Sequence, residues 1–195
     1  MFRNLAKDIT FFLVKNKIVD IEKREVYVYG LEVILLNTVL IAILMGVSLL
    51  FGAIIHFIAF LVFFFPLRIF AGGYHAKTSE KCLVLSTILY TASLVAVQLF
   101  PLLYNSVYAM AAGGVFMIII FIFAPLVNKN NELNVKQIKR NRLITRLLLI
   151  IDLVLLGICY WQGFTVASSG IVLIGLVCVL LLLGKALTKF EGRKD

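Results

Sequence analysis

The stretch VYAMAAGGVFMIIIFIFAPLV, residues 107–127, carries no charged side chain. The hydrocarbon core of a bilayer is about 30 Å thick, and about 20 residues of helix cross it. An apolar block of this length is typical of a membrane-spanning helix, because it offers water almost nothing to solvate. We therefore predict a transmembrane helix over residues 107–127.

Further apolar blocks lie on both sides of this stretch, at 31–50, 53–70, 83–100, 147–161 and 166–187. The whole chain is 62% hydrophobic and 15% charged, with a mean hydropathy of +1.05. A soluble domain is about half apolar and about a quarter charged, so this composition excludes one. We predict an all-α integral membrane protein with six transmembrane helices, folded as a single polytopic domain over residues 1–195.

The basic residues give the predicted spans a direction. All 19 Lys and Arg residues fall at 3–24, 68–81, 129–146 and 185–194, whereas the connections around 52, 101–106 and 162–165 are uncharged. Six spans place every basic group on one face, and the positive-inside rule makes that face cytoplasmic, with both termini on it. Retention of basic loops also accounts for the net charge of +9, so we predict no nucleic-acid partner.

The N-terminal segment, residues 1–28, has apolar residues at helical spacing, at Phe2, Leu5, Ile9 and Phe12, with charges between them. This pattern predicts an amphipathic helix that lies on the inner membrane surface in contact with lipid. The segment lacks the continuous apolar core of a cleavable signal peptide, so we expect it to be retained.

The connection between the second and third blocks reads RIFAGGYHAKTSEKC, residues 68–82. It holds one of the two histidines of the chain, His75, and the one cysteine outside the apolar blocks, Cys82. A cysteine becomes a nucleophile when a histidine, nearby cations or a helix N-terminus favour its thiolate. This segment offers all three, with Arg68 and two lysines as the cations. We predict a reactive pair in which His75 is the base and Cys82 the nucleophile.

Geometry adds a condition to this pair. A continuous helix over 75–82 would separate the two α-carbons by about 10.5 Å, which is too far for a hydrogen bond. We therefore predict that His75 lies in a turn folded back over a helix that begins near Ser79. Gly72 and Gly73 give the backbone the freedom for such a turn. From the residues alone, an ordinary interfacial histidine and an unreactive helix-start cysteine remain the alternative.

The pattern R-x-x-x-G-G-x-H-A-x-x-x-x-x-C at 68–82 resembles the signature of the accessory gene regulator protein B family, bacterial membrane endopeptidases of quorum sensing. The chain length, the six apolar blocks and the passage from Ala-Pro into a basic loop at 124–129 are similar too. The resemblance covers nearly the whole chain, and its specific part is 68–82. It implies that His75 and Cys82 are the catalytic residues.

The family resemblance also implies a reaction. The enzyme would cut a precursor signal peptide on its C-terminal side, hold the remainder as a thioester on Cys82 and promote closure of a thiolactone or lactone ring. The implied partners are a precursor with an acidic C-terminal tail and a second copy of the chain, without a cofactor or metal. The implied location is the bacterial cytoplasmic membrane, with the site on its cytoplasmic side.

Other residues of the segment would support this reaction. Gly72, Gly73 and Arg68 would shape the loop, stabilise the oxyanion or hold a substrate carboxylate, since the planar fork of arginine matches a carboxylate. Glu80 would orient His75, or alternatively would complement the dipole at the start of a helix.

The basic loop at 128–146 would attract the acidic part of the precursor. We expect Lys129, Lys136, Lys139 and Arg140 to contribute, with a purely topological role as the alternative.

Two other function classes compete with a peptidase: a small membrane transporter and a non-catalytic peptide-binding membrane protein. Charged residues are almost absent from the spans, which disfavours the transporter. A metal enzyme is disfavoured because the cytoplasmic face offers one histidine and one cysteine. Within the spans, we interpret His56 as a packing residue and expect Asp152 to reach Arg142 or Arg146.

Overall fold

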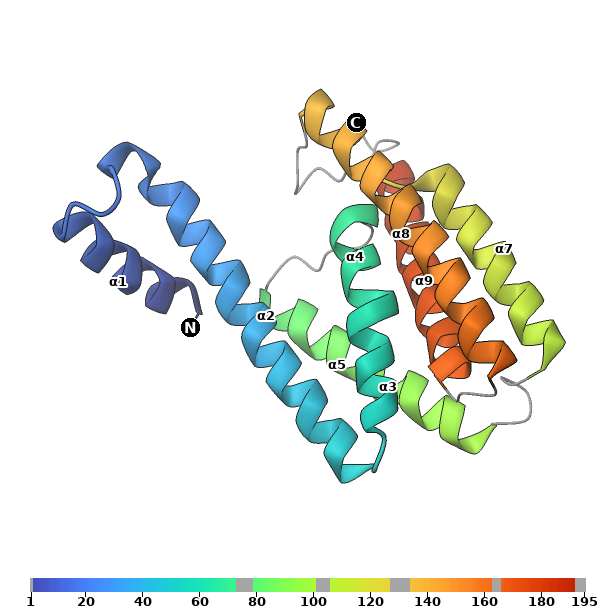
Figure 1. Ribbon diagram of the computed structural model, residues 1–195. Coiled ribbons are helices and arrows are strands. Elements are labelled where there is room, and N and C mark those ends of the chain that lie inside the picture. The colour runs from blue at the N-terminus through green and yellow to red at the C-terminus, as the bar shows by residue number, and fades with distance from the viewer. Residues whose placement is uncertain (1, 73–78, 101–105, 127–133, 163–165, 192–195) are drawn as a thin grey trace.

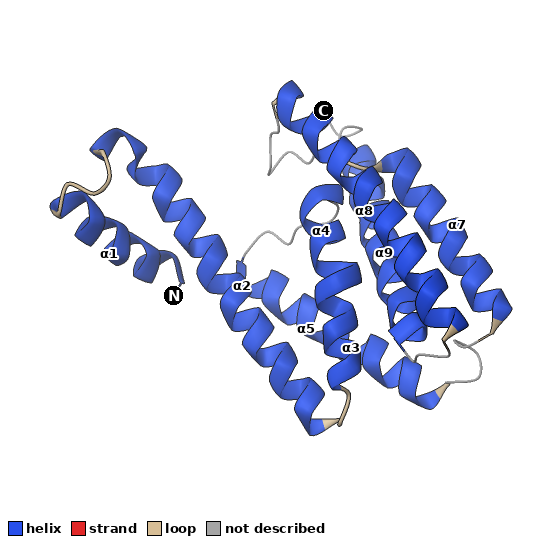
Figure 2. Cartoon of the chain, viewed as in Figure 1, coloured by secondary structure: helices blue, strands red, loops and turns tan. Residues whose placement is uncertain are grey.

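The computed structural model of the chain describes residues 2–72, 79–100, 106–126, 134–162 and 166–191. These residues are almost entirely helical, and no strand occurs among them (Figure 2). The helices are α1 (Phe2–Lys15), α2 (Arg24–Leu50), α3 (Ile54–Ala59), α4 (Phe65–Ala71), α5 (Ser79–Leu99), α7 (Val107–Phe123), α8 (Val135–Trp161) and α9 (Val166–Glu191). A 3-10 turn, Ile21–Lys23, precedes α2, and a π-helical segment, Phe60–Phe64, joins α3 to α4.

Five helical stretches are long and apolar enough to cross a membrane: α2, the continuous run from α3 to α4, α5, α8 and α9. Helix α7 is equally apolar but has 17 residues. The predicted all-helical architecture is therefore confirmed over the described residues, and five of the six predicted spans coincide with a helix of spanning length.

Several predicted boundaries differ from the structure; helix α2, for example, begins at Arg24, seven residues before the predicted span at 31–50. Helix α7 ends at Phe123, four residues before the end of the predicted span, because Pro125 has no N–H to donate and disfavours helical backbone at the residue before it. Helix α8 begins at Val135, twelve residues before the predicted span at 147–161. Most of the basic segment predicted as a loop is thus helical. Its N-terminus is capped, with Gln137 Oε1 accepting from the Asn134 N–H at 2.9 Å.

Helix α9 forms the centre of a bundle in which α7, α8 and the α3–α4 run lie side by side (Figure 1). It is 67% buried across its span, against 17% for α5 and 11% for α2. Gly170 permits this close packing, because a Cβ there would meet Leu156 Cδ2 at 2.7 Å and the Phe63 ring at 3.0 Å. The bundle is therefore organised around α9, and α2 and α5 lie at its edge.

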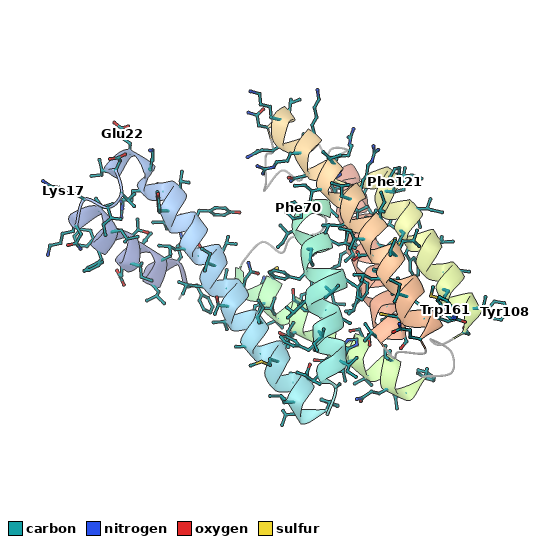
Figure 3. The ribbon with its side chains drawn as sticks, in the orientation of Figure 1. Lys17, Glu22, Phe70, Tyr108, Phe121 and Trp161 are labelled. Carbon is teal, nitrogen blue, oxygen red and sulfur yellow. The ribbon has the colours of Figure 1, made fainter. Side chains whose placement is uncertain are left out.

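Helices α1 and α2 form an arm that extends to one side of the bundle (Figure 1). The helix predicted over 1–28 ends at Lys15, and the chain reverses through Lys17, which has a φ of 56°. Figure 3 shows Lys17 at the tip of the arm. The small residues Ala6 and Thr10 are buried, whereas the larger Leu5 and other apolar side chains of α1 are exposed. The placement of α1 on a membrane surface stays a prediction.

The two ends of the bundle differ in character. Tyr108 at the start of α7 and Trp161 at the end of α8 lie at one end and are 86% and 91% exposed (Figure 3). Phe121 lies toward the opposite end, where the Arg146 guanidinium is 4.4 Å from its ring centroid. Amphipathic aromatic rings are common at membrane–water boundaries, so Tyr108 and Trp161 suit the uncharged face.

Candidate functional site

The segment that leaves α4 turns sharply at Gly72, which has a φ of 72° and a ψ of −143°. An L-amino acid avoids this backbone region because its Cβ would be strained there. A Cβ on Gly72 would also lie 2.7 Å from the Leu126 carbonyl oxygen. Glycine is therefore required at this position for two independent reasons, the backbone angle and the close approach of a second segment.

Two contacts hold this turn in place. The Leu126 N–H donates to the Ala71 carbonyl at 3.0 Å, as part of a short parallel bridge between Gly72 and Leu126. The Arg68 guanidinium donates to the Gly72 carbonyl at 2.5 Å. The start of the predicted catalytic segment is thus held by its own helix and by the segment that follows α7.

Cys82 is the fourth residue of α5, partly buried and not in a disulfide. The predicted helix start near Ser79 is confirmed, since α5 begins there. The first four N–H groups of a helix have no partner within it, so this turn presents donors that can face a negative charge. Arg68 and Cys82 lie within the range of an electrostatic interaction. The structure thus brings together Cys82, the cation Arg68 and the turn at Gly72.

Several predicted site residues are not placed by the structure. Gly73, His75 and Lys129 lie outside the described residues, and the side chain of Glu80 is not described. The fold-back of His75 over the start of α5 therefore stays a prediction, as do the roles of Glu80 and Lys129.

The remaining basic candidates lie on the first turns of α8. Lys136, Lys139 and Arg140 are all exposed there. Helix α8 packs against α4, and its basic start lies at the same end of the bundle as the end of α4 (Figure 1). These cations are therefore carried by a rigid element beside the helix that leads to Gly72.

Of the two polar residues considered within the spans, His56 packs in the interior as predicted, whereas Asp152 does not make its predicted contact. Asp152 is 2% exposed and its Oδ2 has no hydrogen-bond partner, while Arg146 lies against Phe121, so the predicted reach to Arg142 or Arg146 is wrong. His56 is 4% exposed and bonds to two serines on other helices. The serines are far from His56 in sequence and have no distinctive spacing, so no sequence signal marked this cluster.

The bridge between Gly72 and Leu126 was also not foreseen from the sequence. Over the described residues, no group of three or more His, Cys, Asp or Glu side chains is arranged to hold a metal ion. The described part of the candidate site offers a thiol at a helix start that interacts electrostatically with a guanidinium.

Comparison with protein families matches residues 6–183 to the family described as Accessory gene regulator B. The chain belongs to this family. The matched region includes α5 with Cys82 and the turn at Gly72, so the resemblance seen at 68–82 is confirmed at the level of the family.

Curated relatives support the same AgrB assignment. AgrB-like proteins of Listeria monocytogenes and Listeria innocua are each 26% identical over 125 residues, and one of Listeria welshimeri is 27% identical. These alignments cover 62% of this chain and 60% of the relatives, so the chain matches about three-fifths of their length. Their names record a likeness to AgrB and state no activity. No solved structure matches this chain.

Proposed function

We propose that this AgrB-family protein is a membrane cysteine endopeptidase that removes the acidic C-terminal tail of a quorum-sensing precursor peptide and promotes ring closure of the remainder. The observation that carries the proposal is the position of Cys82, a free thiol in the first turn of α5 within reach of the Arg68 charge. A helix start and a cation are two of the features that favour a reactive thiolate. His75 supplies the third.

Cleavage proceeds by covalent catalysis. His75 takes the proton from Cys82 Sγ, and the thiolate attacks the carbonyl carbon of the scissile peptide bond. The C–N bond then breaks, and the proton on His75 passes to the amine of the departing tail. The N-terminal part of the precursor remains as an acyl group on Cys82, joined through a thioester.

Ring closure uses the energy of that thioester. A side-chain thiol or hydroxyl within the bound peptide attacks the acyl carbon, the Cys82–acyl bond breaks, and Cys82 regains a proton. Exchange with a thiol preserves the activated acyl bond, whereas attack by water would destroy it. A site at the lipid boundary favours exchange because it limits water.

The surrounding residues assist these steps without transferring protons. Free N–H groups at the start of α5 stabilise the negative oxygen of the tetrahedral intermediate. Arg68 donates a hydrogen bond to the Gly72 carbonyl. This bond supports a role for Arg68 in holding the turn that precedes His75. The charge of Arg68 also interacts with Cys82 across the site.

The site faces the cytoplasm in a six-span topology. Helix α7 has 17 residues, or about 25 Å of helix, and crosses the bilayer as the fourth span because a small mismatch is absorbed by local thinning. Every basic group then lies on the cytoplasmic face with both termini, in the bacterial cytoplasmic membrane. Crossing by α7 also places the exposed Tyr108 and Trp161 at the outer face.

The partners follow from the same arrangement. The acidic tail of the precursor is drawn to the exposed cations of α8, and the arm formed by α1 and α2 contacts lipid. The working unit is a homodimer, as the family resemblance implies, and nucleic acid is not a partner.

Cleavage of a precursor in membranes tests the proposal. The substrate is the peptide encoded by a short reading frame beside the gene, followed by mass spectrometry. We expect cleavage by the unmodified protein and none by Cys82→Ala or His75→Ala. Cys159→Ala is the control and should keep activity, because Cys159 lies on α8, near the end of that helix, and not at the start of α5. A peptide thioester trapped on Cys82 would identify the nucleophile.

The contrary outcomes are distinct. Cleavage that survives Cys82→Ala would place the nucleophile elsewhere. Binding of the precursor without cleavage would favour a non-catalytic peptide-binding protein, and movement of intact peptide across the membrane would favour a transporter.

A further inference from the structure

A buried polar cluster lies within the helices, well away from Cys82. It consists of Ser48 on α2, His56 on α3, Tyr90 and Ser93 on α5, and Ser169 on α9, each at most 4% exposed. The cluster therefore joins four helices at one point. Buried polar groups in a membrane bundle are costly unless they are bonded, so their bonding pattern is informative.

The hydrogen bonds of the cluster can be assigned a direction. Ser93 Oγ donates its proton to the Tyr90 carbonyl at 2.7 Å, so it must accept from His56 Nε2–H at 3.0 Å. In a neutral imidazole the other ring nitrogen is an acceptor. His56 Nδ1 therefore accepts from the Ser169 hydroxyl at 3.0 Å. Both nitrogens of His56 are used, one toward α5 and one toward α9.

Tyr90 adds a second connection to α5. Its hydroxyl is hydrogen-bonded to Ser48 Oγ on α2. Its ring lies 5.2 Å from the His56 ring and meets Phe60 edge-on at the same centroid distance. Helix α5 is thus held by directional contacts at Tyr90 and Ser93 to α2 and to the α3–α4 run, and through His56 it is linked to α9.

The bond from His56 matters for α5 because few apolar side chains of this helix are buried against protein. Only 17% of its span is buried, and in lipid an apolar side chain packs against acyl chains about as well as against protein. Rotation of α5 about its axis would therefore cost little in apolar contacts. It would break the bond from His56 and leave a buried imidazole N–H without an acceptor.

The same rotation would redirect Cys82. Ser93 and Cys82 are eleven residues apart on one helix, which is about three turns, so they share a face to within about 20°. A slip of one residue would turn that face by about 100°, and Cys82 would lose its position beside Arg68. The bond at Ser93 and the direction of Cys82 are therefore coupled through the rigid helix.

We propose that His56 is a positioning residue for Cys82: its hydrogen bonds to Ser93 and Ser169 fix the rotation of α5 between α3 and α9, and so the direction of the thiol. The effect of His56 on catalysis rests on the proposed function of Cys82 as the nucleophile. The effect of His56 on the rotation of α5 is independent of that function.

The rotation of α5 can be measured directly. Single nitroxide labels are placed at each position from 83 to 89, in full-length protein in lipid bilayers with the native cysteines replaced. Collision with oxygen, which concentrates in lipid, then reports the lipid-facing side. We expect maxima at Val84 and Ile88, which are 55% and 59% exposed. His56→Ala should shift or flatten these maxima. His56→Gln should keep them, because an amide can donate to Ser93 through its N–H and accept from Ser169 through its oxygen.

Cleavage of the precursor, with the native cysteines present, tests the consequence for Cys82. We expect His56→Ala and Ser93→Ala to lower kcat by about 10- to 100-fold, the effect of a misplaced reacting group, with little change in KM. His56→Gln should recover most of kcat. Thr91→Ala is the matched control and should keep full activity, because the Thr91 hydroxyl bonds within α5, to the Thr87 carbonyl at 2.9 Å.

Two results would overturn the proposal. Unchanged maxima in His56→Ala would show that His56 does not set the rotation of α5. Shifted maxima with an unchanged kcat would show that this rotation does not position Cys82. If the unmodified protein cleaves no precursor, the proposed function fails, and the nitroxide profile still decides whether His56 sets the rotation of α5.

Discussion

Gly72 is the residue on which the geometry of the candidate site depends. It ends α4, adopts a positive φ and lies against the Leu126 carbonyl. Its own carbonyl accepts from Arg68. These contacts therefore fix the last described residue before the segment that contains His75.

Gly72→Ala should therefore impair both stability and cleavage. We expect a loss of about 1–3 kcal/mol from the strained backbone, and a fall in kcat because the loop leaves α4 in a different direction. Thermal unfolding in detergent and precursor cleavage measure the two effects. Gly46→Ala on α2 is the control, since a Cβ there meets nothing within 4 Å. Equal activity of both variants would show that the turn does not position the loop.

At the scale of elements, α9 depends on close approaches of its neighbours at two glycines, Gly170 and Gly175. Gly170 lets Phe63 of the π-helical segment and Leu156 of α8 pack against the α9 backbone. The interlocked side chains have little room to move, because protein interiors are close-packed.

Gly170→Val should therefore destabilise the bundle by overpacking. We expect a cost of about 1–3 kcal/mol, seen as a lower midpoint of thermal unfolding by circular dichroism. Gly114→Val on α7 introduces the same side chain where a Cβ meets nothing within 4 Å, and should have a smaller effect. Matching midpoints for the two variants would contradict the packing account.

The basic start of α8 is the second element with a predicted role. Replacing Lys136, Lys139 and Arg140 by glutamine should raise KM for a precursor with an acidic tail, and the difference should shrink at high salt because exposed charges are screened. The matched control replaces three exposed lysines of the N-terminal arm, Lys15, Lys17 and Lys23. An equal rise in KM in both variants would point to the general charge of the membrane face, and no rise in either would remove the role of α8.

At the scale of the whole molecule, the six-span topology depends on whether α7 crosses the membrane. If it crosses, Tyr108 at its start lies outside the cell, and Lys136 at the start of α8 lies inside. Cysteine variants at these two positions, with the native cysteines replaced, can be labelled on intact cells with an impermeant maleimide. We expect Tyr108→Cys to react at once and Lys136→Cys to react after permeabilisation, as Lys17→Cys on the cytoplasmic arm should. Reaction of both Tyr108→Cys and Lys136→Cys on intact cells would show that α7 does not cross and would reduce the spans to five.

The sequence predicted correctly those features that depend only on residues close together in the chain. Apolar blocks located the spanning helices, because burial in lipid depends on each residue's own side chain and on its neighbours along the chain. The start of α5 at Ser79 was predicted for the same reason, since hydroxyl residues at a helix start satisfy free N–H groups locally. The end of α7 and the start of α8 were placed wrongly, because hydropathy finds the apolar part of a helix and not its true ends.

The sequence by itself therefore determined the class of the protein, the positions of most spans and the segment at 68–82 that contains Cys82. Only the tertiary structure decided what surrounds that segment: the bridge from Gly72 to Leu126, and the bonds of His56 to Ser93 and Ser169. These contacts join residues that are far apart in the chain. Which residues become partners depends on how the helices pack against one another. Helix packing depends on the surfaces of all the helices at once, so it cannot be read from any one segment of the sequence.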